Sequence, residues 1–462
     1  MTPSAPRRTV LAAALAAAVT AAAPVAAAAP RGAAPRGASG AAPRAPRPRR
    51  TVEYHAWTTA ADWSHGTHDG TGPAPSARAG IRLRTPAGTA EYHDPHTGST
   101  AAWEYATWTG PHHTLTVPAT ELIASWNALT PPGTWLTVEL RAAYSGGGRT
   151  PWYVMGRWTS GDGDTDIRRT SVDDQKDGRS SVSTDTLAID DPASGTRFTG
   201  YALRVTLHRT PGTTATPTVH RLGAMGSDVP ARFEVPASAP GPAAGRELAV
   251  PRYSQEIHKG QYPEYDNGGE AWCSPTSSQM IIEHWGHRPA PEDLAWVDPS
   301  YADPQVCLAA RRTYDNQYQG CGNWPFNAAY AATYPGLQSV VTRLTSLTDA
   351  EHLIAAGIPV ITSQSFLAPE LTGAGYGTAG HLMTLIGFTP DGDVIANDPA
   401  SPDDPAVRRV YRRREFENIW LRTKRYDAKG QVRSGSGGVC YLYFPVNSAP
   451  TQHRVLRDLG IV

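Results

Sequence analysis

The chain has 462 residues, which is too long for one ordinary domain and suggests two domains with extensions. Lys plus Arg and Asp plus Glu are equal at 42 each, so no overall charge favours nucleic acid or an anionic membrane. We therefore expect neither of these as a partner.

Residues 1–29 are typical of an export signal. Arg7 and Arg8 precede an apolar run that begins at Val10, and small residues suited to cleavage follow it. The paired arginines resemble a twin-arginine signal, but a plain secretory signal has similar features, so the export route stays open. No stop-transfer pattern follows, which makes a permanent membrane anchor the lesser alternative. We expect a secreted protein, extracellular or associated with the cell wall.

Three segments of different composition follow. Residues 30–50 are Pro, Ala, Gly and Arg and cannot bury a core, which predicts a disordered spacer. Residues 51–227 alternate short apolar and polar runs with turn residues, and this texture predicts an antiparallel β-sandwich domain. Two runs place every second residue on one apolar face: Leu136, Val138, Leu140 and Ala142, and Tyr201, Leu203, Val205 and Leu207. Residues 228–247 are again rich in Pro, Ala and Gly and are expected to be the interdomain linker.

The remaining segment, residues 248–462, predicts a separate α+β domain. A helix is expected from Ser274 to Gly286, because Pro275 suits a first helical turn and Gly286 suits the end of a helix. Apolar runs at 358–362, 382–388 and 439–444 predict buried strands.

Cys273 lies directly before this expected helix. Its sulfur would face unpaired backbone N–H groups and the positive end of the helix dipole, which stabilise a thiolate. By itself such a cysteine is more often an inert, small apolar residue.

A histidine and an acid lie farther along. His381 opens an apolar strand after a glycine-rich loop, and Asn397 and Asp398 end the next short strand. If the two strands pair, Asp398 or Asn397 lies beside the imidazole. Each element has a structural alternative, since His381 could serve packing and Asn-Asp-Pro is a favourable turn. Together they match what a thiolate–imidazolium pair with an orienting third residue requires.

Four segments also carry a resemblance to a known family: VPRYSQ at 250–255, AWCSPTSSQM at 271–280, GH at 380–381 and NDPAS at 397–401. They resemble the bacteriocin-processing-like cysteine peptidases, the peptidase C39-like family, over about residues 248–444. The resemblance implies a papain-like fold with a Cys273, His381 and Asp398 triad. It also implies a glutamine that donates to the oxyanion, for which Gln255 matches and Gln261 is the alternative. Secreted members carry a similar N-terminal β domain of unassigned role.

The remaining cysteines allow a structural alternative for Cys273. Cys307 and Cys321 flank a short polar segment and are expected to form a disulfide, which closes a loop worth roughly 3 kcal/mol. Cys440 lies in an apolar run and is expected to be a buried free thiol. A Cys273–Cys440 bridge stays open and would abolish the mechanism.

The first domain contains histidines and tryptophans that suggest other functions. The histidines form two His-x-x-His spacings, His65/His68 and His93/His96, and an adjacent pair at 112 and 113. They lack a helical register, so we expect exposed loop residues that bind no metal. Eight of the thirteen tryptophans fall in this domain. Aromatic side chains suit sugar stacking, but we expect most of these to be core.

The leading hypothesis is a secreted cysteine hydrolase that cleaves peptide or amide bonds through an acyl-enzyme, without a cofactor. A cell-wall amidase or endopeptidase acting on peptidoglycan stem peptides uses the same triad. The non-enzyme alternative is an inert protein whose sandwich binds surface glycans.

Overall fold

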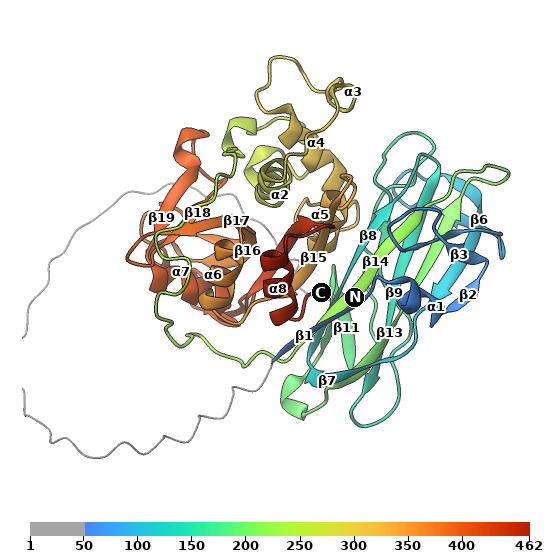
Figure 1. Ribbon diagram of the computed structural model, residues 1–462, viewed down its shortest axis with the longest axis horizontal. Helices are drawn as coiled ribbons and strands as arrows, with labels where there is room; N and C mark the ends of the chain where they lie inside the picture. The colour runs from blue at the N-terminus through green and yellow to red at the C-terminus, as the bar shows by residue number, and fades with distance from the viewer. Residues whose placement is uncertain (1–50) are drawn as a thin grey trace, which may run out of the picture.

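The computed structural model describes residues 51–462. The expected export signal at residues 1–29 and the spacer at 30–50 lie outside the described residues. Two sheet-containing regions pack side by side, with the N-terminal strands on the right of Figure 1 and the C-terminal sheet and its helices on the left. The prediction of a mixed α+β chain with a sheet-rich N-terminal region is confirmed.

The N-terminal region consists of two antiparallel sheets. The inner sheet, which faces the C-terminal region, contains β11 (Ser180–Ser183), β12 (Thr186–Ile189), β8 (Glu121–Leu129), β14 (Thr218–Ser227), β4 (Ile81–Leu83), β3 (Thr71–Pro73) and β1 (Val52–Trp57). The outer sheet contains β10 (Tyr153–Trp158), β9 (Thr134–Tyr144), β13 (Phe198–Arg209), β6 (Thr100–Thr109), β2 (Thr67–Asp69), β5 (Gly88–His93) and β7 (His113–Ala119). A short helix, α1 (Ala60–Ser64), follows β1.

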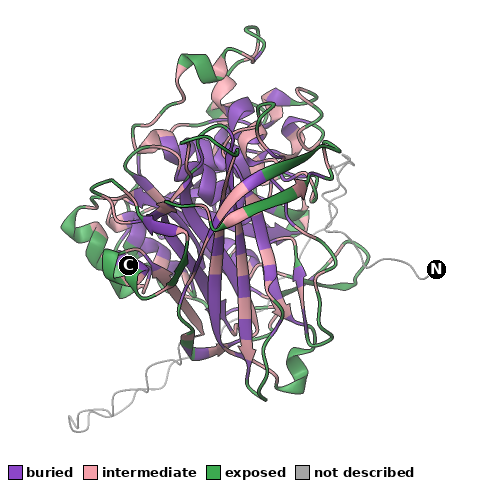
Figure 2. Ribbon diagram, turned by 90° about the vertical axis from the view of Figure 1, so that its right-hand side faces the viewer, coloured by how far each residue is buried: buried purple, intermediate pink, exposed green. Residues whose placement is uncertain are grey.

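Alternating side chains hold these two sheets together. The two apolar faces expected in β9 and β13 are buried in one core cluster with residues of β8 and β14. Figure 2 views the molecule from the side of the sandwich and shows buried and partly exposed residues alternating along its long strands. Seven of the eight tryptophans of this region are less than 9 % exposed, so the expectation that most of them are core is confirmed.

The C-terminal region is built on one antiparallel sheet of order β15-β22-β16-β17-β18-β19. Its strands are β15 (Leu337–Arg343), β22 (Val439–Pro445), β16 (Val360–Phe366), β17 (Thr378–Phe388), β18 (Val394–Asn397) and β19 (Arg408–Tyr411), and β20 (Lys424–Tyr426) with β21 (Val432–Ser434) forms a separate ribbon. Its helices are α2 (Cys273–His284), α3 (Pro291–Leu294), α4 (Pro304–Thr313), α5 (Trp324–Ala331), α6 (Leu347–Ala355), α7 (Arg413–Leu421) and α8 (Pro450–Asp458). Single 3-10 turns lie at η1 (Pro192–Ser194), η2 (Glu256–His258), η3 (Gly269–Ala271), η4 (Ala368–Glu370) and η5 (Pro405–Val407).

Helix α2 agrees with the sequence expectation. Pro275 lies in its first turn, and Gly286 adopts a left-handed φ of 82° just after its end, which a residue without Cβ does at little cost. Two serines fix the helix on the sheet: Ser274 bonds to the Tyr441 hydroxyl at 3.0 Å and Ser278 to that of Tyr443 at 2.9 Å. These contacts hold the first turn of α2 against β22.

The two regions meet through strand β8. Seven of its nine residues are buried, because one face packs in the sandwich and the other against α5 and β15. Trp126 lies 6.1 Å from the Phe326 ring, and the Asn127 amide bonds to the backbone oxygen and nitrogen of Ser339 at 2.8 and 3.2 Å. One core cluster therefore extends through both regions.

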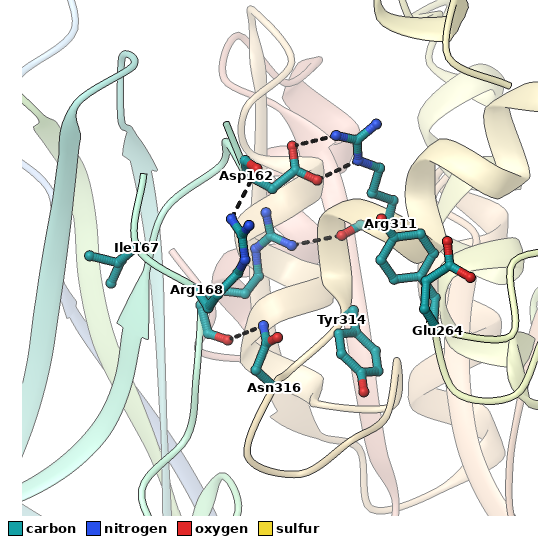
Figure 3. Close-up of a pocket in the computed structure, with 9 residues that line it drawn as sticks. Asp162, Ile167, Arg168, Glu264, Arg311, Tyr314 and Asn316 are labelled. Carbon is teal, nitrogen blue, oxygen red and sulfur yellow. Dashed lines mark hydrogen bonds and ion pairs between the residues drawn. The ribbon is translucent and has the colours of Figure 1, made fainter. Parts of the chain in front are cut away.

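A polar contact closes the edge of this interface. Figure 3 shows Asp162 of the sandwich accepting from the Arg311 guanidinium of α4, and Arg168 donating to the Asp162 backbone oxygen at 3.0 Å. Arg169, almost fully buried, donates to the Arg311 backbone oxygen at 2.7 Å. A cavity of about 260 Å³ remains between these residues and Tyr265 and Tyr314.

Within residues 51–462, no helix has the length and apolar character needed to cross a membrane.

Candidate active site

Cys273 is the first residue of α2. The preceding Trp272 is fully buried, and its indole donates to the Tyr265 backbone oxygen at 2.6 Å, which fixes the chain just before the helix. No side chain caps the N-terminus of α2, so no side chain bonds to its first backbone N–H groups. The positive end of the helix dipole therefore lies next to Cys273. Cys273 is partly exposed, whereas the other three cysteines are buried.

His381 lies near the beginning of β17, and its partner is Asp398, which follows the next strand, β18. Strand β17 pairs with β18 in a register that matches Thr384 with Asn397, and Asp398 follows directly. The His381 Nε2 lies 2.8 Å from Asp398 Oδ1, and both residues are at most 4 % exposed. The structure therefore selects Asp398 over Asn397, whose amide instead donates to the Pro251 backbone oxygen at 2.9 Å.

The charges of this pair support each other. Burial alone opposes an imidazolium, but Asp398 and the Cys273 side chain, which hydrogen-bonds to the ring, outweigh it and raise the pKa of His381 to about 10. Although burial opposes the carboxylate too, the charge and hydrogen bond of His381 and the hydroxyls of Tyr411 and Tyr376 hold the pKa of Asp398 below its ordinary value. Because Nε2 faces Asp398, Nδ1 is the nitrogen left for the sulfur.

Two tyrosines complete the surroundings of Asp398, and no sequence pattern indicated either role. The Tyr376 hydroxyl donates to Oδ1 and Oδ2 at 3.1 and 2.9 Å, and the Tyr411 hydroxyl donates to Oδ2 at 2.6 Å. The Ala400 backbone N–H adds a bond to Oδ1 at 3.0 Å. Tyr376 lies in the glycine-rich loop before β17 and Tyr411 ends β19, so only the fold brings them to one carboxylate.

Gln255, the expected oxyanion donor, lies close to the start of α2. Its Nε2 donates to the backbone oxygen of Glu270, three residues before Cys273, at 2.7 Å, while its Oε1 is buried without a partner. The alternative, Gln261, uses both ends of its amide elsewhere: Oε1 bonds to the His258 ring at 2.9 Å and Nε2 to the Ile257 backbone oxygen at 3.2 Å. Of the two, Gln255 is the one whose amide bonds to the segment that leads into Cys273.

A further glutamine was missed by the sequence reasoning. Gln364 of β16 is the cross-strand partner of His381 and is 1 % exposed, and neither end of its amide has a partner in the described chain. Directly paired residues of antiparallel strands point to the same face, so Gln364 shares the face of His381. The apolar-looking strand that contains it carries no motif that could have identified it.

The expectation of a Cys307–Cys321 disulfide is wrong, because all four cysteines are free. The Cys307 sulfur lies 3.6 Å from His258 Nδ1 within the core, and the Cys321 sulfur points to the Ala310 backbone oxygen at 3.5 Å. Their positions flanking a polar segment suggested a loop closure, but packing directs each sulfur to a different partner. Cys440 is a buried free thiol as expected, and the alternative Cys273–Cys440 bridge is absent.

The paired histidines of the first region bond to ordinary polar groups. His68 contacts Thr71 Oγ1 at 2.8 Å, His93 contacts Thr100 Oγ1 at 3.0 Å and His96 contacts Thr170 Oγ1 at 2.9 Å. His68, His93 and His113 lie on β2, β5 and β7, so the expectation that they are loop residues is wrong for these three. Within residues 51–462, no group of three or more His, Cys, Asp or Glu residues is arranged to hold a metal ion.

Comparison with known families agrees with this division of the chain. The model of the peptidase C39 N-terminal domain matches residues 53–227, and that of the peptidase C39-like family matches residues 247–428. An α+β region with a helix-start cysteine beside a His–Asp pair is thus found on a chain that both models match. The chain belongs to the peptidase C39-like family. No curated protein matches the chain.

Proposed function

We propose that this chain is a secreted cysteine peptidase of papain-like fold that cleaves peptide or amide bonds through an acyl-enzyme. The observation that carries the proposal is the His381 imidazole, which is bonded to Asp398 at 2.8 Å and also interacts with the Cys273 side chain. Family membership supports cysteine peptidase chemistry. A papain-like fold is supported by the nucleophile-bearing helix, which packs on an antiparallel sheet that supplies the histidine.

In the proposed reaction His381 is protonated and Cys273 is a thiolate, stabilised by the imidazolium and by the uncapped start of α2. The sulfur attacks the carbonyl carbon of the substrate and forms a tetrahedral intermediate. The resulting oxyanion accepts hydrogen bonds from the Cys273 backbone N–H and from Gln255, after its amide turns from the Glu270 oxygen. His381 then donates its proton to the leaving amine, and the acyl group stays on the sulfur.

A water molecule completes the cycle. His381, now neutral, removes a proton from the water, which attacks the thioester carbonyl; the C–S bond breaks, the acid product leaves and the Cys273 thiolate is restored beside the imidazolium. Asp398 keeps Nε2 as the donor nitrogen throughout, and its four hydrogen bonds fix its own orientation. Each oxyanion donor is expected to lower the activation barrier by about 2.7–4 kcal/mol.

The test is site-resolved alkylation of the secreted mature protein with iodoacetamide at pH 6 without reductant. An ordinary thiol has a pKa near ~8.5 and reacts slowly at this pH, whereas a thiolate paired with an imidazolium reacts fast. We expect rapid labelling of Cys273 and a rate at least about tenfold lower in His381→Ala. An unreactive Cys273 in the wild type contradicts the proposal.

The chain contains its own controls for this experiment. Cys307, Cys321 and Cys440 are fully buried and should stay unlabelled until the protein unfolds. Hydrolysis of peptide libraries and of purified wall fragments, each compared with Cys273→Ala, then assigns the substrate class. Recovery of the protein from the culture medium tests export.

A further inference from the structure

The outer sheet of the N-terminal region contains a cavity that the peptidase reaction does not use. It has a volume of about 250 Å³ and is lined by residues of five strands, β5, β6, β13, β9 and β10. Its lining residues of β9 and β13 alternate with the core residues of the same strands, so the cavity lies on the face of the outer sheet that is turned away from the inner sheet.

Strand curvature forms the cavity. Strands β5 and β10 belong to opposite sides of the outer sheet, yet the Arg157 guanidinium of β10 lies 5.3 Å from the centre of the Tyr92 ring of β5. Trp103 and Trp135 form one wall, with ring centres 5.8 Å apart, and His208 stacks on Trp135 at 3.7 Å. The result is a groove with an aromatic wall and a polar rim.

Polar atoms of this wall lack partners. The indole nitrogens of Trp103 and Trp135 are buried without a hydrogen bond, and these side chains are only 6 % and 3 % exposed. His208 Nδ1 is unpartnered as well. Burying a polar group without a partner costs about 1–3 kcal/mol, and three such atoms belong to residues that line one cavity, so its lining keeps unused hydrogen-bonding capacity.

The mixture of groups selects the chemistry of that ligand. Indole N–H groups only donate, the Glu91 carboxylate only accepts, and a neutral imidazole does both. Burial keeps the pKa of His208 at about 3, so its ring is neutral. The charges of the lining balance, because Glu139 is paired with Arg204 at 2.6 Å, which leaves Glu91 and Arg157 with opposite single charges.

We propose that this cavity binds one ring of a neutral saccharide. Each sugar hydroxyl both donates and accepts hydrogen bonds, so one saccharide can accept from the indoles, donate to the carboxylate and do either with the imidazole. An anion could only accept from these groups and a cation could only donate to them. The C–H faces of a sugar ring pack on aromatic side chains. A cavity of about 250 Å³ is below the range of about 300–1,000 Å³ typical of drug-sized ligands and suits a single ring.

The proposal is independent of catalysis, so the test uses the full chain with Cys273→Ala, which binds but cannot cleave. Cellohexaose, chitohexaose and mannohexaose are titrated by calorimetry and by tryptophan fluorescence. We expect at least one of the three to bind and to change the fluorescence, because Trp103 and Trp135 line the site.

Two groove variants and one matched control decide the outcome. Arg157→Ala removes the rim and Thr206→Trp fills the floor, and both should weaken binding about tenfold or more. Arg141→Ala is the control, since Arg141 also stacks on an aromatic ring, Trp152 at 4.6 Å, on the same sheet outside the cavity. Unchanged unfolding midpoints show that the variants fold.

The proposal is overturned if none of the three saccharides binds. It is also overturned if both groove variants bind as the parent does, or if the control weakens binding as much as they do.

Discussion

The carboxylate of Asp398 accepts four hydrogen bonds besides its role as partner charge for His381, if the two bonds from Tyr376 are counted separately. Such donors stabilise the ionised form, and burial alone would favour the neutral acid. We infer that Tyr376 and Tyr411 are positioning residues that keep Asp398 ionised and oriented at the pH where the peptidase works.

This role predicts a specific pH effect for Tyr411→Phe. Removal of one donor should raise the pKa of Asp398, so the acid limb of the Cys273 alkylation rate should move to higher pH by about half a unit to one unit. Folded-state stability at neutral pH should fall by about 1 kcal/mol. Rate–pH profiles for iodoacetamide measure the shift.

Tyr443→Phe is the matched control. Tyr443 is equally buried, but its hydroxyl bonds to Ser278 at 2.9 Å and not to Asp398. It should lose stability without moving the profile. Equal shifts in both variants would show that Tyr411 acts only through general packing.

At the scale of elements, the segment that leads into α2 is held in an uncommon backbone conformation. Tyr262, Asp266 and Asn267 have φ values of 46°, 60° and 65°, in the left-handed region that costs most residues about 1 kcal/mol. Buried contacts stabilise it: Asp266 accepts from the Cys321 backbone N–H at 3.0 Å. Because Asn267 lies two residues before the start of η3 and Cys273 follows η3 closely, the stability of this segment bears on the placement of the nucleophile.

Asp266 makes this segment sensitive to pH. Burial raises its pKa to about 7, above the value of about 3.8 expected in the unfolded chain. The folded state therefore binds the proton more tightly, and the stability that this contributes is full below about pH 4 and is lost as pH rises through about 7.

Asp266→Asn should remove this loss. Asparagine is neutral, tolerates the left-handed region and keeps an acceptor for the Cys321 N–H. We expect the variant to gain about 1 kcal/mol or more relative to wild type between pH 4 and pH 8. Urea unfolding at several pH values measures the gain, and the exposed Asp391→Asn should show none. A pH-independent difference for Asp266→Asn contradicts the assignment.

At the scale of the whole molecule, the two regions behave as one packed body. Strand β8 is covered on both faces, and the core cluster runs from the sandwich through Trp126 and Phe326 to the C-terminal sheet. Isolated domains joined by a linker would instead keep polar outer surfaces. The N-terminal region is therefore part of the folded peptidase chain and not a loosely attached module.

Asn127→Ala tests this coupling. Asn127 is 1 % exposed and bonds to both the backbone and the side chain of Ser339, so its loss leaves buried polar groups unpaired. We expect a loss of roughly 2–4 kcal/mol and a single unfolding transition that shifts as a whole. Calorimetry measures it, with the exposed Asn447→Ala as control. Two separate transitions, only one of which moves, would contradict the single-body description.

Much of this architecture was determined by the sequence alone, because it depends on local pattern. The period-two apolar faces of β9 and β13, the place of Pro275 in the first turn of α2 and the end of α2 near Gly286 follow from short-range sterics and burial. The resemblance to the peptidase family and the juxtaposition of His381 with Asp398 were likewise accessible, since two strands joined by a short turn pair with each other.

Only the tertiary structure decided what depends on contacts between distant segments. It turned Asn397 to Pro251 and Asp398 to His381, because pairing register sets which side chain shares the face of the imidazole. It brought Tyr376, Tyr411 and Gln364 to the His–Asp pair and kept Cys307 and Cys321 apart as thiols, although their spacing suggested a bridge. The aromatic groove of the outer sheet also depends on distant segments, since the curvature of five strands leaves no local signature in the chain.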